Sequence, residues 1–117
     1  MTTETTRPEA HTFVAFEVAL EIVRSLRDIV PLVRRRNAKL ASQIEDAASS
    51  VAANLAEGNR RRGKDRVHFF LIAAGSADET RAHLRVAEAW GWVKVEDTES
   101  TLHLIDRELR LIWGLTR

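Results

Sequence analysis

The feature that most constrains the fold is a helical spacing of apolar residues in four successive segments of the chain. Within each segment apolar side chains recur every three or four residues, and none shows the strict alternation of a strand. The expected helices cover residues 13–30, 39–58, 64–90 and 97–115. The connections between them are short, about five to ten residues, which makes consecutive helices antiparallel neighbours. The pattern therefore predicts an all-α protein, an up-down-up-down four-helix bundle over residues 13–117.

Particular residues predict where these helices begin and end. Pro31 disfavours helical geometry at the residue before it, so the first helix is expected to bend or end there. Gly58 and Gly91 follow helical segments and are expected to be left-handed C-caps. Asp97 or Thr98 can cap the start of the last helix.

Small and aromatic residues suggest how the helices pack. The second segment has one stripe of larger apolar residues and a neighbouring stripe of alanines, which lets another helix approach closely. Gly75 and Ser76 are interpreted as a close-packing notch between helices. The three tryptophans, Trp90, Trp92 and Trp113, are interpreted as core and interface anchors before any role in stacking on bases.

Two of the expected helices carry more apolar surface than one inner face needs. The first has two apolar stripes, and the last has Leu104, Leu111 and Leu115 beside its inward row. One explanation is a wide inner face in a small bundle. The other is a subunit interface, which exposed apolar patches of this kind favour.

Composition places the chain among single-domain soluble proteins. It has 117 residues and no cysteine, so disulfides, thiolate chemistry and cysteine-based zinc sites are excluded. Residues 1–12 are polar and lack the apolar core of a signal peptide, so they are expected to be a disordered tail. No apolar run approaches the roughly 18 residues of a membrane span. We expect a cytoplasmic protein that does not associate with membranes.

The middle of the chain carries a recognisable motif. Residues 40–58 read "LASQIEDAASSVAANLAEG", an arginine-rich turn follows, and residues 69–79 read "FFLIAAGSADE". This succession resembles the four-helix-bundle proteins encoded in 23S rRNA intervening sequences, and "WGWV" at residues 90–93 is similar to the aromatic turn after their third helix. Ala52 stands where the family often has proline, Thr80 where it often has leucine, and "VRRRNAK" is longer and more basic than usual.

The resemblance implies a bundle that assembles as an oligomeric ring, typically a homopentamer. It implies no established enzymatic activity and no cofactor. It also implies association with nucleic acid or a ribonucleoprotein, since a similar bundle is an accessory protein to the reverse transcriptase of diversity-generating retroelements. Some relatives are interpreted as protein scaffolds instead.

The sequence argues against a metal site and against nucleophilic catalysis. A di-iron site in a bundle needs a Glu-x-x-His pair on each of two helices, and the chain has no such pair among its four histidines. The serines lack the turn that exposes a nucleophile, and "EGNRRRG" lacks the spacing of a phosphate-binding loop. We therefore predict no catalytic residues, no metal and no cofactor.

Three polar residues share one face of the second expected helix. Ser50, Asn54 and Glu57 follow one another at spacings of four and three. A general base held by an amide is one interpretation, and a structural polar seam that fixes helix register is the other. The structural interpretation is favoured because no second acid or base is visible nearby in the sequence.

The excess of positive charge lies in two connections that flank the second helix. Residues 34–39 carry four basic residues and no acid, and residues 59–66 carry five and one. Two ends about 27 Å apart cannot form one patch in a single subunit, but each would repeat around one rim of a ring. The predicted nucleic-acid-binding residues are Arg34, Arg35, Arg36, Lys39, Arg60, Arg61, Arg62, Lys64 and Arg66.

These clusters leave more than one function open. Two basic rims suit binding to the phosphate backbone of RNA or DNA, with weak sequence preference. The arginines could equally solvate helix ends, where cations are favoured after a C-terminus. An acidic protein partner would use the same rims, which makes a protein-interaction scaffold the alternative, and an enzyme that uses Glu57 is a weaker third.

Overall fold

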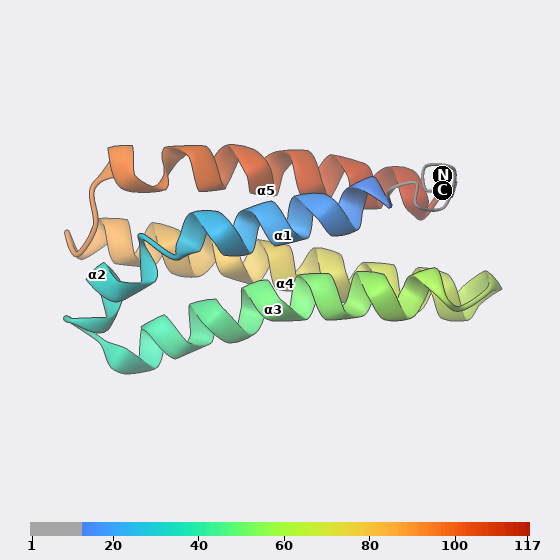
Figure 1. Ribbon diagram of the computed structural model, residues 1–117, viewed down its shortest axis with the longest axis horizontal. Coiled ribbons are helices and arrows are strands. Elements are labelled where there is room, and N and C mark those ends of the chain that lie inside the picture. Colours follow the sequence, from blue (N-terminus) through green and yellow to red (C-terminus); the bar gives the residue numbers. More distant parts are fainter. Residues whose placement is uncertain (1–12) are drawn as a thin grey trace, which may run out of the picture.

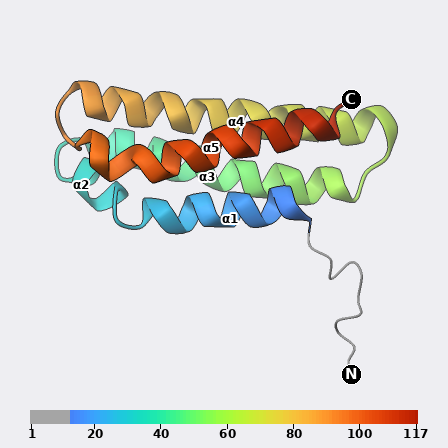
Figure 2. The same cartoon turned by 90° about the horizontal axis from the view of Figure 1, so that it is seen from above.

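The computed structural model describes residues 13–117, and this part of the chain contains five α-helices and no strand. The helices are α1 (Val14–Leu26), α2 (Val30–Arg34), α3 (Ala38–Asn59), α4 (Gly63–Ala89) and α5 (Val95–Leu115). Four of them lie side by side, with the short α2 at one end (Figures 1 and 2). The all-α prediction is confirmed. No helix in residues 13–117 is long and apolar enough to cross a membrane, and the expected tail, residues 1–12, lies outside the described residues.

The first expected helix is interrupted, as Pro31 predicted, but the interruption lies at residues 27–29 and a second short helix follows it. α1 ends at Leu26, and α2 begins at Val30 with Pro31 in its first turn. In one continuous helix the ring of Pro31 would clash with the carbonyl of Arg27, four residues earlier. The chain therefore breaks at residues 27–29, and Pro31 occupies a helix start, where its missing N–H costs little.

Two predicted C-cap glycines have different roles. Gly91 has φ +76° after the end of α4, as predicted for a left-handed cap. Gly58 is not a cap, because it lies inside α3 and is buried. A Cβ added to Gly58 would lie 2.8 Å from two ring atoms of Phe70, so this glycine allows α3 and α4 to approach closely. Positive φ after α3 falls instead on Gly63, the first residue of α4.

The core forms mainly from the stripes that the sequence predicted. In α3 the larger apolar stripe is buried throughout, whereas the alanine stripe is buried at Ala41 and Ala48 but exposed at Ala56. Small residues of α1 and α4 face the same core, and the largest fully buried apolar side chains are Phe70, Ile22, Ile44, Leu55, Leu84, Ile105 and Ile112. Alanines and large side chains therefore alternate across a thin, closely packed interior.

Hydroxyl groups join the helices in pairs. Ser50 Oγ of α3 lies 2.8 Å from Ser76 Oγ of α4. Ser25 Oγ of α1 lies 2.7 Å from Thr101 Oγ1 of α5, a contact between residues 76 positions apart. The first pair joins two helices that follow one another in the chain, and the second joins the first helix to the last (Figure 1).

Several apolar residues lie on the surface of the described chain. Trp90 is 68% exposed and Trp113 is 47% exposed, so neither is a core anchor, and their interface role stays a prediction. Trp92 is half-buried against the core. Gly75 has no side-chain or backbone neighbour where its Cβ would lie, so the predicted notch is formed by Ser76 alone. Leu71 of α4 is also exposed.

One carboxyl group is buried where the sequence suggested none. Glu108 of α5 is fully buried, and neither of its carboxyl oxygens has a hydrogen-bond partner among the described residues. Loss of water around the group raises the pKa of Glu108 to about 8, and the nearby Arg107 opposes this shift. Glu108 is therefore protonated and neutral at pH 7.

Candidate nucleic-acid interface

The first basic cluster lies at the end of the bundle that carries α2. It consists of Arg34, Arg35, Arg36 and Lys39, and we call it the α2-end cluster. The chain turns between α2 and α3, where the side chain of Asn37 accepts a hydrogen bond of 2.9 Å from the backbone N–H of Leu40. This N-cap satisfies a free donor at the start of α3 and holds the turn in place.

Only one member of the α2-end cluster is paired. Arg34 contacts Glu45 of α3 at 2.6 Å, and its guanidinium donates to Ser42 at 3.4 Å. Arg35, Arg36 and Lys39 are exposed and form no ion pair with any residue in 13–117. Three cationic side chains are therefore free to meet an external anion here.

The second basic cluster lies at the turn between α3 and α4, at the opposite end of the bundle (Figures 1 and 2). It consists of Arg60, Arg61, Arg62, Lys64 and Arg66, and we call it the α3–α4 cluster. The 22 residues of α3 separate the two clusters, a span of about 33 Å at 1.5 Å per residue. In one chain they form two sites, as the sequence predicted.

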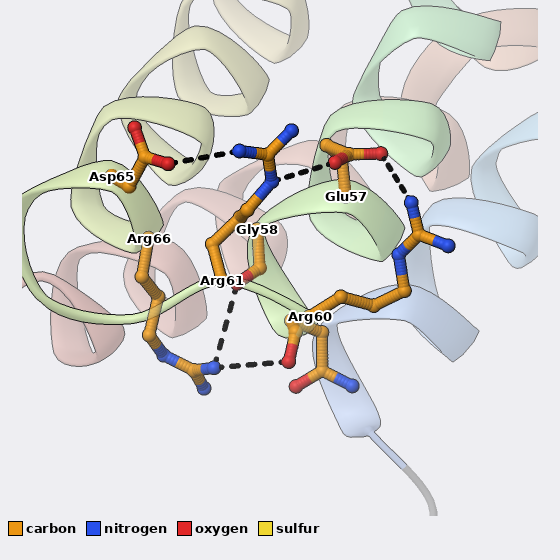
Figure 3. A network of polar contacts seen from close by, with 7 residues as sticks. Glu57, Gly58, Arg60, Arg61, Asp65 and Arg66 are labelled. Carbon is orange, nitrogen blue, oxygen red and sulfur yellow. Dashed lines mark hydrogen bonds and ion pairs between the residues drawn. The ribbon is translucent and has the colours of Figure 1, made fainter.

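Carboxylates hold two arginines of the α3–α4 cluster (Figure 3). Glu57 contacts Arg60 at 2.9 Å and Arg61 at 2.8 Å, and Arg61 also contacts Asp65 at 2.9 Å. The hydrogen bond from Arg61 is the main reason that the pKa of Glu57 is below its ordinary value. Arg60 and Arg61 are exposed, but their guanidinium groups are partly engaged by these carboxylates.

Arg66 is turned toward the protein. Its guanidinium donates to the carbonyl of Asn59 at 3.2 Å and, at 3.5 Å, to that of Gly58 (Figure 3). The guanidinium also lies 4.9 Å from the ring centre of Phe70. The Gly58 carbonyl also accepts from the backbone N–H of Arg61 at 3.0 Å. The Asn59 carbonyl lies in the last turn of α3, where helix carbonyls lack intrahelical donors, so Arg66 acts there as a C-terminal cap. One of its terminal nitrogens, Nη1, makes both of these hydrogen bonds.

Arg62 and Lys64 remain free in the α3–α4 cluster. Both are exposed, and neither forms an ion pair within the described residues. Of the nine predicted binding residues, the structure therefore leaves five cations available: Arg35, Arg36, Lys39, Arg62 and Lys64.

The expected polar seam is divided. Asn54 Nδ2 donates to the backbone oxygen and to the hydroxyl of Ser50, each at 2.9 Å, and Ser50 in turn contacts Ser76. Glu57 lies outside this group and bonds the arginines of the next turn. Nothing in this arrangement gives Glu57 a partner of the kind that a general base needs.

Two further observations bear on the chemistry of the site. No group of three metal-ligating side chains occurs in the described part of the chain.

The ion pairs of the α3–α4 cluster could have been predicted from the sequence. Glu57, Arg60, Arg61 and Asp65 follow one another at spacings of three or four residues, and residues so spaced are neighbours on a helix. The available chemistry is cationic: exposed guanidinium and ammonium groups at two ends of an all-α protein.

Comparison with known proteins extends this description. The chain belongs to the family of 23S rRNA-intervening sequence proteins, whose family model matches residues 13–114. This confirms the resemblance that the motif at residues 40–58 suggested. Among curated proteins, none matches this chain.

A solved structure is similar in fold. It is the crystal structure of a protein with unknown function from the S23 ribosomal protein family, from Bacteroides thetaiotaomicron VPI-5482. The TM-score is 0.79 at 20% sequence identity, and the match covers 89% of this chain and 99% of the other. At this identity the likeness concerns the fold alone.

Proposed function

We propose that the protein is a non-enzymatic, oligomeric accessory protein of the cytoplasm that binds the phosphate backbone of nucleic acid through its two basic ends. The observation that carries this proposal is the set of five exposed and unpaired cations in the two clusters. Guanidinium and ammonium groups bind phosphate oxygens irrespective of base sequence. The expected binding is therefore strong at low salt and weak in sequence preference.

We expect the α2-end cluster to contribute most of the salt-dependent affinity. Replacing Arg35, Arg36 and Lys39 together with alanine should weaken binding at low salt by on the order of tenfold or more. With three fewer phosphate contacts, binding releases fewer counterions and the free energy of binding is less favourable. The slope of log affinity against log salt should fall by about two to three. Fluorescence anisotropy with labelled RNA and DNA across a salt series measures both quantities.

Matched variants make this experiment selective. Arg62→Ala/Lys64→Ala tests the α3–α4 cluster, and Arg24→Ala/Arg110→Ala removes two exposed arginines that belong to neither cluster. The slope of log affinity against log salt could decrease as much in the Arg24/Arg110 control as in the cluster variants. Binding would then be spread over the surface, which would contradict its assignment to the two clusters. Absence of binding by the wild type at low salt would end the nucleic-acid proposal.

The proposed assembly is an up-down-up-down four-helix bundle arranged in a closed ring, most simply a homopentamer. The Ser50–Ser76 contact and the 3.0 Å Arg81–Asp106 contact support an antiparallel order, since each joins the middle parts of two helices that are connected by a short turn. Two separate apolar surfaces support head-to-tail contact between subunits. One lies on α4, with Leu71, Ile72 and Val86, and the other lies on α1 and α5, with Val14 and Trp113.

Light scattering should therefore give a mass several times the 13.2 kDa of one chain. Ile72→Glu should lower that mass toward the monomer, because a carboxylate would have to be desolvated in the subunit contact. Gln43→Glu, on the exposed side of α3, is the matched control and should leave the mass unchanged. A wild-type mass near 13.2 kDa at micromolar concentration would contradict the ring.

A second function, the protein scaffold, has one observation in its favour. A groove of about 850 Å³ lies between α1, α2 and α3, with apolar residues such as Leu26, Pro31 and Ala48 beside the arginines Arg27 and Arg35. An amphipathic acidic helix would fit such a surface. Purification with and without nuclease separates the two functions, since a stoichiometric protein that survives nuclease favours the scaffold and co-purified nucleic acid favours the first proposal.

A further inference from the structure

An exposed pair of stacked tryptophans lies in the turn between α4 and α5. The rings of Trp90 and Trp92 have centroids 5.6 Å apart and planes 11° apart. Trp92 is half-buried against the core, and Trp90 is 68% exposed. Trp92 therefore supports one side of a ring that remains largely open to solvent.

The backbone holds this pair in place. Trp92 N–H donates to the carbonyl of Ala87 at 3.0 Å, and Gly91 N–H donates to that of Glu88 at 2.9 Å. Together with φ +76° at Gly91, these bonds form a Schellman turn at the end of α4. The indole of Trp90 is thus presented by a defined turn, so a ligand that stacks on it pays little to order the site.

The tryptophan turn and the α2-end cluster occur at the same end of the bundle (Figures 1 and 2). Arg35, Arg36 and Lys39 supply free cations there. The first turn of α5 is less suitable for a polyanion, because Glu96 and Asp97 are exposed beside Lys94. A phosphate backbone would therefore extend from the tryptophan turn toward α2 and not along α5.

We propose that Trp90 is a stacking platform for a base of single-stranded nucleic acid whose phosphates are bound by the α2-end cluster. A base in a duplex is already stacked on both faces, whereas a base in a single strand can stack on an exposed aromatic ring. The inference rests on the proposed function and specifies its ligand as single-stranded. Binding of the phosphate backbone alone does not require an exposed aromatic side chain, so the inference also gives Trp90 a role.

The test compares three labelled probes of equal length: a single-stranded oligonucleotide, its duplex, and an abasic strand that keeps the phosphates but has no bases. For the wild type, anisotropy should show the single strand bound more tightly than the abasic strand. Trp90→Ala should weaken binding of the single strand roughly 5- to 150-fold, the range for one stacked base. Its affinity for the abasic strand should be unchanged.

Two variants keep the result specific. Trp90→Phe retains an aromatic face and should retain much of the preference for the single strand. His103→Ala removes another exposed ring, which lies on α5 and belongs to neither basic cluster nor either apolar surface, and should have no effect. Light scattering on Trp90→Ala checks its assembly.

The outcomes separate this inference from the function on which it rests. Equal affinity of the wild type for single strand, duplex and abasic strand, unaltered in Trp90→Ala, would overturn the stacking platform and leave backbone binding intact. A changed mass for Trp90→Ala would place Trp90 in a subunit contact and would also overturn it. No binding of any probe by the wild type would overturn the nucleic-acid function itself.

Discussion

Replacing Glu108 with leucine is expected to stabilise the protein at neutral and alkaline pH and to remove most of the pH dependence of its stability. Glu108 is fully buried, and its carboxyl oxygens have no partner in the described chain. A buried polar group without a hydrogen bond destabilises the folded state. An apolar side chain of similar size would fill the same space without that cost.

The sign of the pH effect follows from where the proton is held. Burial raises the pKa of Glu108 from its ordinary value of 4.5 to about 8, so the folded chain keeps the proton after the unfolded chain has lost it. The contribution of Glu108 to stability is therefore most favourable below pH 4.5 and declines as pH rises to about 8. A pKa difference of this size corresponds to a total loss of about 5 kcal/mol.

Denaturant unfolding of the wild type and Glu108→Leu between pH 5 and 9 measures this contribution. The wild type should lose stability across that range, and the variant should lose much less. Glu108→Gln should share the flat profile but be less stable than Glu108→Leu, because its amide is still unpaired. A wild-type profile parallel to that of Glu108→Leu would show that Glu108 does not titrate with a raised pKa.

Replacing Gly58 with valine should destabilise the fold by about 3 kcal/mol, the upper part of the range for overpacking a core. A Cβ at this position would lie 2.8 Å from Phe70 ring atoms and 3.1 Å from Phe69 Cβ, and the Phe70 ring is fully buried. Either α3 and α4 separate or the ring leaves its site. Both changes disturb the end of α3 on which the arginine turn is built.

Ala56→Val is the matched control for this prediction. Ala56 is exposed on α3, two residues before Gly58, so its replacement should cost only the difference in helix propensity, about 0.5 kcal/mol. Thermal or denaturant unfolding compares the two variants directly. Equal effects at the two positions would contradict the close approach of α3 and α4 at Gly58.

The sequence was sufficient to predict the helices because their apolar spacing is long and regular. Pro31 predicted an end or bend of the first helix at Val30, but not that α1 ends at Leu26. Ile29 and Val30 continue the apolar spacing although the backbone leaves the helix at residues 27–29. Gly58 shows a second limit. A glycine near the end of a helical run predicts a cap, but only the position of Phe70 on the neighbouring helix reveals that it is a packing site.

The sequence predicted which cationic residues make up the candidate site, but not which of them remain unpaired and able to bind a ligand. The two basic clusters are visible as runs of arginine and lysine, and the three- and four-residue spacing around Glu57 indicated which arginines it could pair with. The bond from Arg66 to the end of α3 depends on the path of the turn, which no local pattern specifies. Glu108 occupies an inward position of α5, but a charged residue type predicts exposure.

The Ser25–Thr101 contact between α1 and α5 has a consequence for the order of folding. It joins residues 76 positions apart, so forming it requires the closure of a long loop, whereas α3 and α4 are joined by a connection of three residues, 60–62. Loop closure is less costly in entropy for nearby segments, and local contacts form faster. We therefore expect the α3–α4 hairpin to form early and α1 to dock late. A nascent chain would present its arginine turn before the bundle is complete.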